Sequence, residues 1–311
     1  MKNVVFYIEA EWAFGVIHHE LCKYLFSEGY NCTVLHWSKK YTIEEIVELN
    51  SVTDIWVTNP QGYYSLVYAY QCIPREKLVV VSHALIDLNF ILENKLDADL
   101  YQMKSFCVVS KFLADYSIAI GIKRRPHITP VGINYHAFHC KPSFQLKTVG
   151  YGGWYQDRQR PVESKNQEVI DRKENKRAYL AKECAQIAGL GFLVASDYHN
   201  SFVTMTGFYG TIDCVIIPSM HEGAGLPALE AAAAGRLVIG TKVGHWVDKI
   251  APKGGIEAPM DEVDFISFTL KTLNYYKAEP VAFQDKCYEI QQHAKTYDWS
   301  NCLSHWIEAF K

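Results

Sequence analysis

Long apolar runs are missing from this chain of 311 residues. No stretch approaches the roughly 20 apolar residues that a membrane-spanning helix needs. The N-terminal segment MKNVVFYIEAEW stays apolar for only about six residues before Glu9, which is too short for a secretory signal peptide. We therefore expect neither a transmembrane segment nor a secretory leader.

Paired cysteines and an excess of basic charge are missing as well. The 9 cysteines form no C-x-x-C pair, and several lie inside apolar runs, as is typical of reduced core residues in a cytosolic protein. The formal net charge of −3 excludes the broad basic field of a typical nucleic-acid-binding protein. We predict a cytoplasmic protein without a nucleic-acid partner. The basic cluster IKRRPH (122–127) is interpreted as a solvated loop, and peripheral membrane contact stays open.

What the sequence does contain is alternating strand-like and helix-like segments. NVVFYIEA, NCTVLHW, DIWVTNP, KLVVVSH and SFCVVSK have the length and apolar content of buried strands, with helical stretches between them. After a polar, proline-containing segment near residue 140, a second series begins at KTVGYGG and continues to RLVIGT. This alternation predicts parallel sheets with right-handed crossovers, in two α/β domains that enclose a ligand cleft.

The most informative segment is PSMHEGAGLPALEAAAAG, residues 218–235. It follows the apolar strand IDCVIIP and precedes the strand RLVIGT. Pro227 suits the first turn of a helix, and Gly235 suits a left-handed helix end. The pattern therefore predicts strand, loop, short helix and strand, with the loop at the carboxyl end of a strand, where ligands bind in such sheets.

The residue types in this loop favour one kind of ligand. Gly223, Ala224 and Gly225 leave the backbone N–H groups open to close approach, and the helix N-terminus that follows favours phosphate. Glu222 and Glu230 would repel phosphate, but a carboxylate accepts two hydrogen bonds from a sugar diol. A diphosphate between two diol-bearing rings, as in a nucleotide sugar, satisfies both requirements. Read alone, either glutamate would be an ordinary surface residue.

This segment resembles the signature of the retaining glycosyltransferases of family 4, the glycosyl transferases group 1. Their motif is Glu-Gly-Phe-Gly-Leu-Pro-x-x-Glu-Ala, and this sequence has EGAGLPALEA, with Ala224 in place of phenylalanine. The resemblance implies that Glu222 contacts hydroxyls of the donor sugar and that Glu230 holds the ribose diol. It also implies that the amides of Gly225 and Leu226 reach sugar and phosphate oxygens.

The resemblance extends, more weakly, over most of the chain. It includes FCVVSKFLADYSIAIGI, HITPVGINYHAF and the C-terminal TYDWSNCLSHWIEAFK. It implies an α/β protein of the GT-B fold, with two Rossmann-like, doubly wound parallel-sheet domains facing each other across a cleft. We expect an acceptor-side domain at 1–141 and a nucleotide-sugar donor domain at 142–294. The helix at 295–311 is expected to cross back to the first domain.

The sequence departs from the family where the donor diphosphate is neutralised. The family has a Gly-Arg-Leu loop after the first strand of the second domain and a lysine further on, whereas here Tyr151 stands at the arginine position before a long polar insert. KRAYLAKEC matches the start of the family's lysine helix and nominates Lys176. Arg160 with Lys165 is the competing pair, and Arg160 stays a candidate donor contact.

Four further residues are weighed outside this segment. His83 follows a strand at the position where related enzymes carry a histidine near the donor sugar, although such a residue is as often structural. Gly15 lies where the family has an acceptor-side loop, or is merely a helix-entry glycine. Asp97 and Asp99 repeat the Asp-x-Asp pattern of metal-dependent glycosyltransferases, but that pattern belongs to a different fold. We interpret them as exposed helix aspartates and predict no catalytic metal and no cofactor.

The resulting expectation is a metal-independent, retaining glycosyltransferase that moves a hexose-type sugar from a nucleotide diphosphate to a glycan or another hydroxyl acceptor. Glu222, Lys176 and His83 are its predicted catalytic residues. Three alternatives stay open: a nucleotide-sugar 2-epimerase of the same fold, a DNA-modifying glucosyltransferase, which the acidic net charge disfavours, and a non-catalytic nucleotide-binding module.

Overall fold

The computed structural model describes residues 1–8, 13–153, 175–198, 202–246 and 253–311. The chain forms two compact units, which are described separately. The first combines Met1–Gly132 with Trp299–Lys311, and the second is Ile133–Asp298.

The first unit is built on a sheet of six parallel strands in the order β2-β1-β3-β4-β5-β6. Its strands are β1 (Lys2–Ile8), β2 (Tyr30–His36), β3 (Ile55–Thr58), β4 (Leu78–Ser82), β5 (Ser105–Val108) and β6 (His127–Ile128). Its main helices are α1 (Ala13–Ser27), α2 (Ile43–Val52), α3 (Pro60–Tyr64), α4 (Leu85–Glu93), α5 (Lys111–Ala119) and α13 (Trp299–Ala309). β3, β4 and β5 are buried along their whole length, which explains why their sequences are continuously apolar or small.

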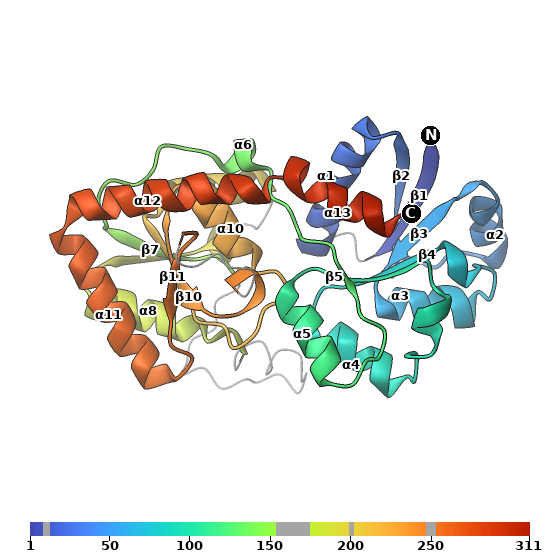
Figure 1. Ribbon diagram of the computed structural model, residues 1–311. Helices are drawn as coiled ribbons and strands as arrows, with labels where there is room; N and C mark the ends of the chain where they lie inside the picture. The colour runs from blue at the N-terminus through green and yellow to red at the C-terminus, as the bar shows by residue number, and fades with distance from the viewer. Residues whose placement is uncertain (9–12, 154–174, 199–201, 247–252) are drawn as a thin grey trace. The chain divides into compact units, whose positions relative to one another are not determined.

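The C-terminal helix α13 belongs to this first unit although it follows the whole second unit in sequence. It packs against α1 and β5, while α3 and α4 cover the other face of the sheet (Figure 1). Trp299, Trp306 and Phe310 are fully buried, and the Trp306 indole N–H donates to the carbonyl of Pro130 over 3.0 Å. Burying three large aromatic side chains holds the end of the chain in this unit.

The second unit contains a sheet of five parallel strands in the order β11-β10-β9-β7-β8. Its strands are β7 (Thr148–Tyr151), β8 (Gly191–Val194), β9 (Cys214–Ile217), β10 (Leu237–Thr241) and β11 (Ile256–Ala258). Its helices are α6 (Tyr135–Phe138), α8 (Ala178–Ile187), α9 (Phe202–Thr211), α10 (Leu226–Ala233), α11 (Glu262–Ala278) and α12 (Pro280–Ala294). The sheet lies between α10 with α12 on one face and α8 on the other (Figure 1).

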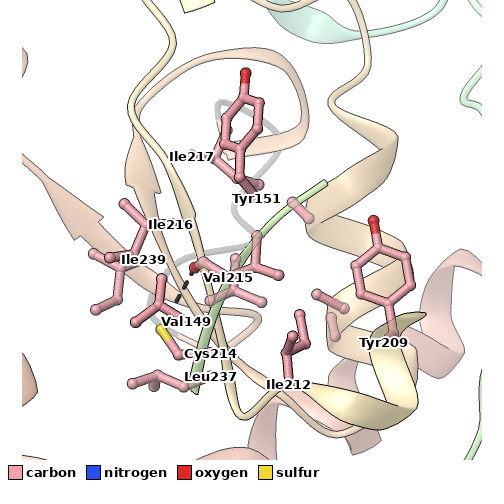
Figure 2. Close-up of a cluster of buried hydrophobic side chains, with 14 of the residues drawn as sticks. Val149, Tyr151, Tyr209, Ile212, Cys214, Val215, Ile216, Ile217, Leu237 and Ile239 are labelled. Carbon is pink, nitrogen blue, oxygen red and sulfur yellow. Dashed lines mark hydrogen bonds between the residues drawn. The ribbon is translucent and has the colours of Figure 1, made fainter. Parts of the chain in front are cut away.

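The core of the second unit gathers where β7, β9 and β10 meet the helices. Val149, Val215 and Ile239 come from these three strands, and Ile212 precedes β9 (Figure 2). The alanine run of α10 is buried almost completely, because only small side chains let this helix lie close to α12 and the sheet. The predicted strand, loop, short helix and strand at 212–241 is therefore confirmed.

Two helices of this unit end in a left-handed glycine, and only one of these glycines is enclosed. Gly189 follows α8 with φ +64°, and a Cβ there would meet only the Lys277 ammonium at 4.0 Å. Gly235 follows α10 with φ +69°, and a Cβ there would lie 2.8 Å from the Cα of Pro142.

We expect Gly189→Ala to lower the free energy of unfolding by about 1 kcal/mol, the cost of a left-handed alanine. Gly235→Ala should cost about 3 kcal/mol or more, because the contact with the Pro142 backbone is added. Urea unfolding of the two variants measures the difference. Equal losses in both variants would contradict the packing around Gly235.

Candidate active site

Strand order determines where the candidate site lies in the second unit. β7 is the first strand of this sheet, with β8 on one side and β9 on the other. The loops that leave the carboxyl ends of β7 and β9 therefore diverge at a point where the strand order reverses, which is where doubly wound sheets bind ligands. Gly152 follows β7, and residues 218–225 follow β9.

Glycines let the chain pass closely around the loop after β9. Gly225 has φ +78° and ψ 48° and is the N-cap of α10, and Pro227 occupies the first turn. A Cβ on Gly152 would lie 2.7 Å from both the Pro227 Cβ and the Tyr209 hydroxyl, and one on Gly244 would lie 2.6 Å from the Ala224 carbonyl oxygen. Gly225, as the N-cap, has no side chain to cap the first turn of α10, and this helix N-terminus, with its partial positive charge, directly follows the loop at the carboxyl edge of the sheet.

Glu222 is the centre of a polar network in this loop. Its Oε2 lies 2.5 Å from the Lys176 ammonium, and its Oε1 accepts a 2.7 Å hydrogen bond from the Ser219 hydroxyl. The Thr241 hydroxyl donates to the Ser219 carbonyl and so ties the loop to the end of β10. The Glu222 side chain is 14% exposed and the Lys176 side chain 39%, which leaves the lysine open to solvent and to an incoming anion.

Glu230 lies one turn into α10 in a different environment. Its Oε2 accepts a 2.8 Å hydrogen bond from the buried hydroxyl of Tyr209 in α9. Burial raises the pKa of Glu230 from 4.5 to about 7, and the hydrogen bond from Tyr209 opposes that rise. Burial and the Glu230 carboxylate together raise the pKa of Tyr209 well above 10. The phenol therefore stays protonated and donates to Glu230.

Tyr151, at the position of the family's loop arginine, ends β7 with its ring buried. A tyrosine cannot supply the positive charge of an arginine. Burial and the nearby Glu222 carboxylate both raise the pKa of the Tyr151 hydroxyl, so this hydroxyl stays protonated near neutral pH. Figure 2 shows the hydroxyls of Tyr151 and Tyr209 pointing away from the apolar cluster. The competing candidates Arg160 and Lys165 lie outside the described residues.

The predicted residues of the first unit lie at the carboxyl edge of its own sheet. His83 directly follows β4 and is buried, and its backbone N–H donates to Asp87 Oδ2 over 2.6 Å. The His83 ring lies 5.0 Å, centroid to centroid, from that of His18 in α1. Burial and the neighbouring His18 lower the pKa of His83 well below 6.5, so it is a neutral imidazole at neutral pH. Gly15 is buried in the first turn of α1.

Three polar residues near Glu222 and Glu230 were not singled out from the sequence. Ser219 and Tyr209 contact the two glutamates directly, and Arg177 binds the Pro218 carbonyl at the start of the loop. Ser219 and Arg177 lie inside the quoted segments, as the second residues of PSMHEGAGLPALEAAAAG and KRAYLAKEC, which is a weak signal for both. Tyr209 lies in an apolar helix and has no sequence signal, since only the packing of α9 on α10 brings it to Glu230.

The Asp-x-Asp pair does not have the predicted exposed position. Asp97 and Asp99 are both half-buried, and Asp99 accepts hydrogen bonds from the hydroxyls of Tyr63 and Tyr68. Asp97 accepts one from the backbone N–H of Lys123 over 3.2 Å. The two side chains therefore stabilise the surrounding loops rather than facing solvent.

The described residues contain neither a metal-ligand cluster nor a helix that could span a membrane. Among these residues, no group of three or more His, Cys, Asp or Glu side chains is arranged to hold a metal ion. In the same part of the chain, every helix is too short or too polar to cross a membrane.

Part of the second unit matches a known protein family in sequence. Residues 145–274 match the family model described as glycosyl transferases group 1. That range contains Glu222, Glu230, Lys176 and the whole loop after β9. The family match supports a group 1 glycosyltransferase. No curated protein matches the chain in sequence.

Solved structures agree on the fold over almost the whole chain. Sucrose-phosphate synthase from Thermosynechococcus elongatus has a TM-score of 0.69 at 13% identity, covering 99% of this chain and 98% of that one. Anabaena HepE in complex with UDP-glucose has a TM-score of 0.68 at 12% identity, covering 99% of both chains. A glycosyltransferase from Rickettsia africae has a TM-score of 0.66 at 15% identity, covering 100% and 98%. With the two all-parallel sheets, these neighbours confirm the predicted GT-B fold class.

The raised pKa of Glu230 makes folding stability depend on pH. Between about pH 4.5 and 7 the folded state keeps a proton on Glu230 that the unfolded chain has lost, so stability falls as pH rises through this window. Glu230→Gln removes this dependence and keeps an acceptor for Tyr209. We expect the free energy of unfolding of the variant, relative to wild type, to rise by about 2–3 kcal/mol from pH 4.5 to pH 8.

Urea unfolding at several pH values measures this difference. Glu257→Gln, at an exposed carboxylate on β11, is the matched control. For this variant the difference in free energy of unfolding from wild type should not change with pH. A flat profile for Glu230→Gln as well would show that the carboxyl is not buried as described.

Proposed function

We propose that this protein is a glycosyltransferase that transfers a hexose-type sugar from a nucleoside diphosphate sugar to a glycan or another hydroxyl acceptor. The observation that carries the proposal is the pair of glutamates in different environments around one glycine loop. Glu222 is paired with the Lys176 ammonium, and Glu230 lies half-buried one turn into the helix that follows, beside the Tyr209 hydroxyl. Both lie within the range that matches the group 1 family model.

The donor diphosphate is assigned to Lys176 and the N-terminus of α10. The Lys176 side chain is 39% exposed and carries its ammonium group into the loop after β9, and the N-terminus of α10 adds a partial positive charge at the same edge of the sheet. As the bond to the sugar breaks, negative charge grows on the departing diphosphate, and a lysine beside it stabilises that charge. A nucleoside diphosphate sugar as donor is further supported by the HepE neighbour, which was solved with UDP-glucose.

The sugar and the ribose are assigned to the two glutamates. Glu222 lies beside the proposed phosphate site and can accept hydrogen bonds from the transferred sugar once Lys176 turns to the diphosphate. Glu230 accepts the ribose diol while Tyr209 holds its carboxyl group in place. We propose that transfer occurs with retention, and that the first unit, with neutral His83 and the segment at Gly15, takes the acceptor.

Glu222→Gln and Glu230→Gln distinguish these two roles. Glu222→Gln should lower kcat about a hundredfold, because the carboxylate helps most when the sugar ring gains positive charge. It should leave affinity for the free nucleoside diphosphate unchanged or tighter, since Lys176 loses its carboxylate partner. Glu230→Gln should raise KM and weaken nucleoside diphosphate binding about ten- to a hundredfold, with little change in kcat.

The measurements are steady-state kinetics and calorimetric titration of each variant with UDP and the other nucleoside diphosphates. Loss of nucleotide binding in Glu222→Gln, with binding intact in Glu230→Gln, would reverse the two assignments. Turnover of donor without acceptor to an epimerised nucleotide sugar would establish the 2-epimerase instead. Tight nucleotide binding without turnover of any donor would leave a binding module.

We also propose that catalysis needs no divalent metal, because Lys176 and the α10 N-terminus supply the positive charge that a metal ion otherwise provides. Turnover should persist in excess EDTA at close to its rate without chelator. The assay compares EDTA-treated enzyme with the same sample after addition of Mn²⁺ or Mg²⁺. Activity that disappears with EDTA and returns with Mn²⁺ would refute metal independence.

A further inference from the structure

Arg177 is a charged residue that the proposed reaction does not yet use. It directly follows Lys176, and its side chain is 6% exposed. Its backbone has φ +45° and ψ 37°, a left-handed conformation that a residue with a side chain rarely adopts. Such a conformation persists only where the surroundings hold it in place.

The guanidinium of Arg177 joins three segments of the second unit. Its Nε donates to the Pro218 carbonyl over 2.6 Å, at the start of the loop that carries Glu222. Its Nη1 donates to the Met260 carbonyl over 2.8 Å, directly before the N-cap of α11. The Arg177 carbonyl itself accepts from the Leu180 N–H in the first turn of α8. One side chain thus ties the start of α8 to the loops that follow β9 and β11.

A backbone contact beside Arg177 continues this link. The N–H of Met220 donates to the Asn175 carbonyl over 2.7 Å. Lys176 therefore lies between two anchors, the Asn175 carbonyl and the Arg177 guanidinium, both bound to the loop after β9. Its ammonium meets Glu222 in that same loop.

We propose that Arg177 is the positioning residue that holds Lys176 against the Glu222 loop. The guanidinium of Arg177 holds the loop after β9 in place. The left-handed backbone at Arg177 places Lys176 outside helix α8, so that the Lys176 side chain points to Glu222. This inference rests on the proposed function for its effect on turnover, whereas its effect on Lys176 itself can be measured without any substrate.

The test uses Arg177→Gly, because glycine accepts the left-handed backbone and removes only the guanidinium links. We expect kcat to fall about ten- to a hundredfold, as for a catalytic group displaced by about 1 Å. In a Lys176→Ala background the same substitution should cause no further loss of kcat, since Arg177 acts through Lys176.

Arg236→Gly is the matched control. Arg236 is also 6% exposed, and its guanidinium binds the Tyr209 carbonyl and the Cys140 sulfur, but it directly precedes β10, at the amino edge of the sheet. Both substitutions should lower the melting temperature. Only for Arg177→Gly should the loss of kcat disappear in the Lys176→Ala background. Equal losses of kcat in the two variants, or equal losses with and without Lys176, would overturn the proposal.

A labelling experiment without any substrate tests this inference independently of the proposed function. Acetylation of Lys176 by an amine-reactive ester, followed by mass spectrometry, should be slow in wild type and several-fold faster in Arg177→Gly, with Lys242 as the internal reference. Glu222→Gln, which removes the ion-pair partner, calibrates the fully released lysine. Unchanged labelling of Lys176 in Arg177→Gly refutes the positioning role, whatever the donor assays show. Increased labelling in a protein that turns over no nucleotide sugar refutes the proposed function alone.

Discussion

The parallel direction of the strands is the constraint on which the candidate site depends. Because all five strands of the second sheet run the same way, their carboxyl ends meet at one edge, and each must be followed by a loop there. Lys176, Glu222 and Gly244 follow β7, β9 and β10 and come together at that edge, although almost seventy residues separate the first from the last.

Buried polar groups then determine the shape of the loops at this edge. A buried hydrogen-bonding group left without a partner costs about 1–3 kcal/mol, so each must be satisfied as the loops fold. Arg177 satisfies the carbonyls of Pro218 and Met260, and Thr241 satisfies that of Ser219. The Ser219 hydroxyl in turn orients Glu222. The loop is glycine-rich, yet its conformation is held by side chains from two other segments, the start of α8 and the end of β10.

The two glutamates show how one fold gives the same residue type two properties. Glu222 faces the ammonium of Lys176, whereas Glu230 lies beside the phenol of Tyr209, and burial raises the pKa of Glu230 to about 7. Under the proposed function, binding of the ribose diol to the Glu230 carboxylate would be coupled to loss of a proton near neutral pH, while binding of the sugar at Glu222 would require only that Lys176 exchanges partners. The difference comes from the neighbours that the fold places at each carboxylate, Lys176 and Ser219 at Glu222 and Tyr209 at Glu230, and not from the loop motif that they share.

The sequence by itself determined the alternation of strands and helices, the fold class, the boundaries of the segment 212–241 and the left-handed glycine after α10. These follow from local patterns, because strand burial, proline and glycine act within a few residues. Tertiary structure alone decided that Tyr209 contacts Glu230, that Arg177 joins three loops, and that Asp97 and Asp99 are half-buried rather than exposed. Each of these depends on side chains from elements distant in sequence, whose contacts arise only when α8, α9 and the strand-end loops pack together, and no local pattern encodes that packing.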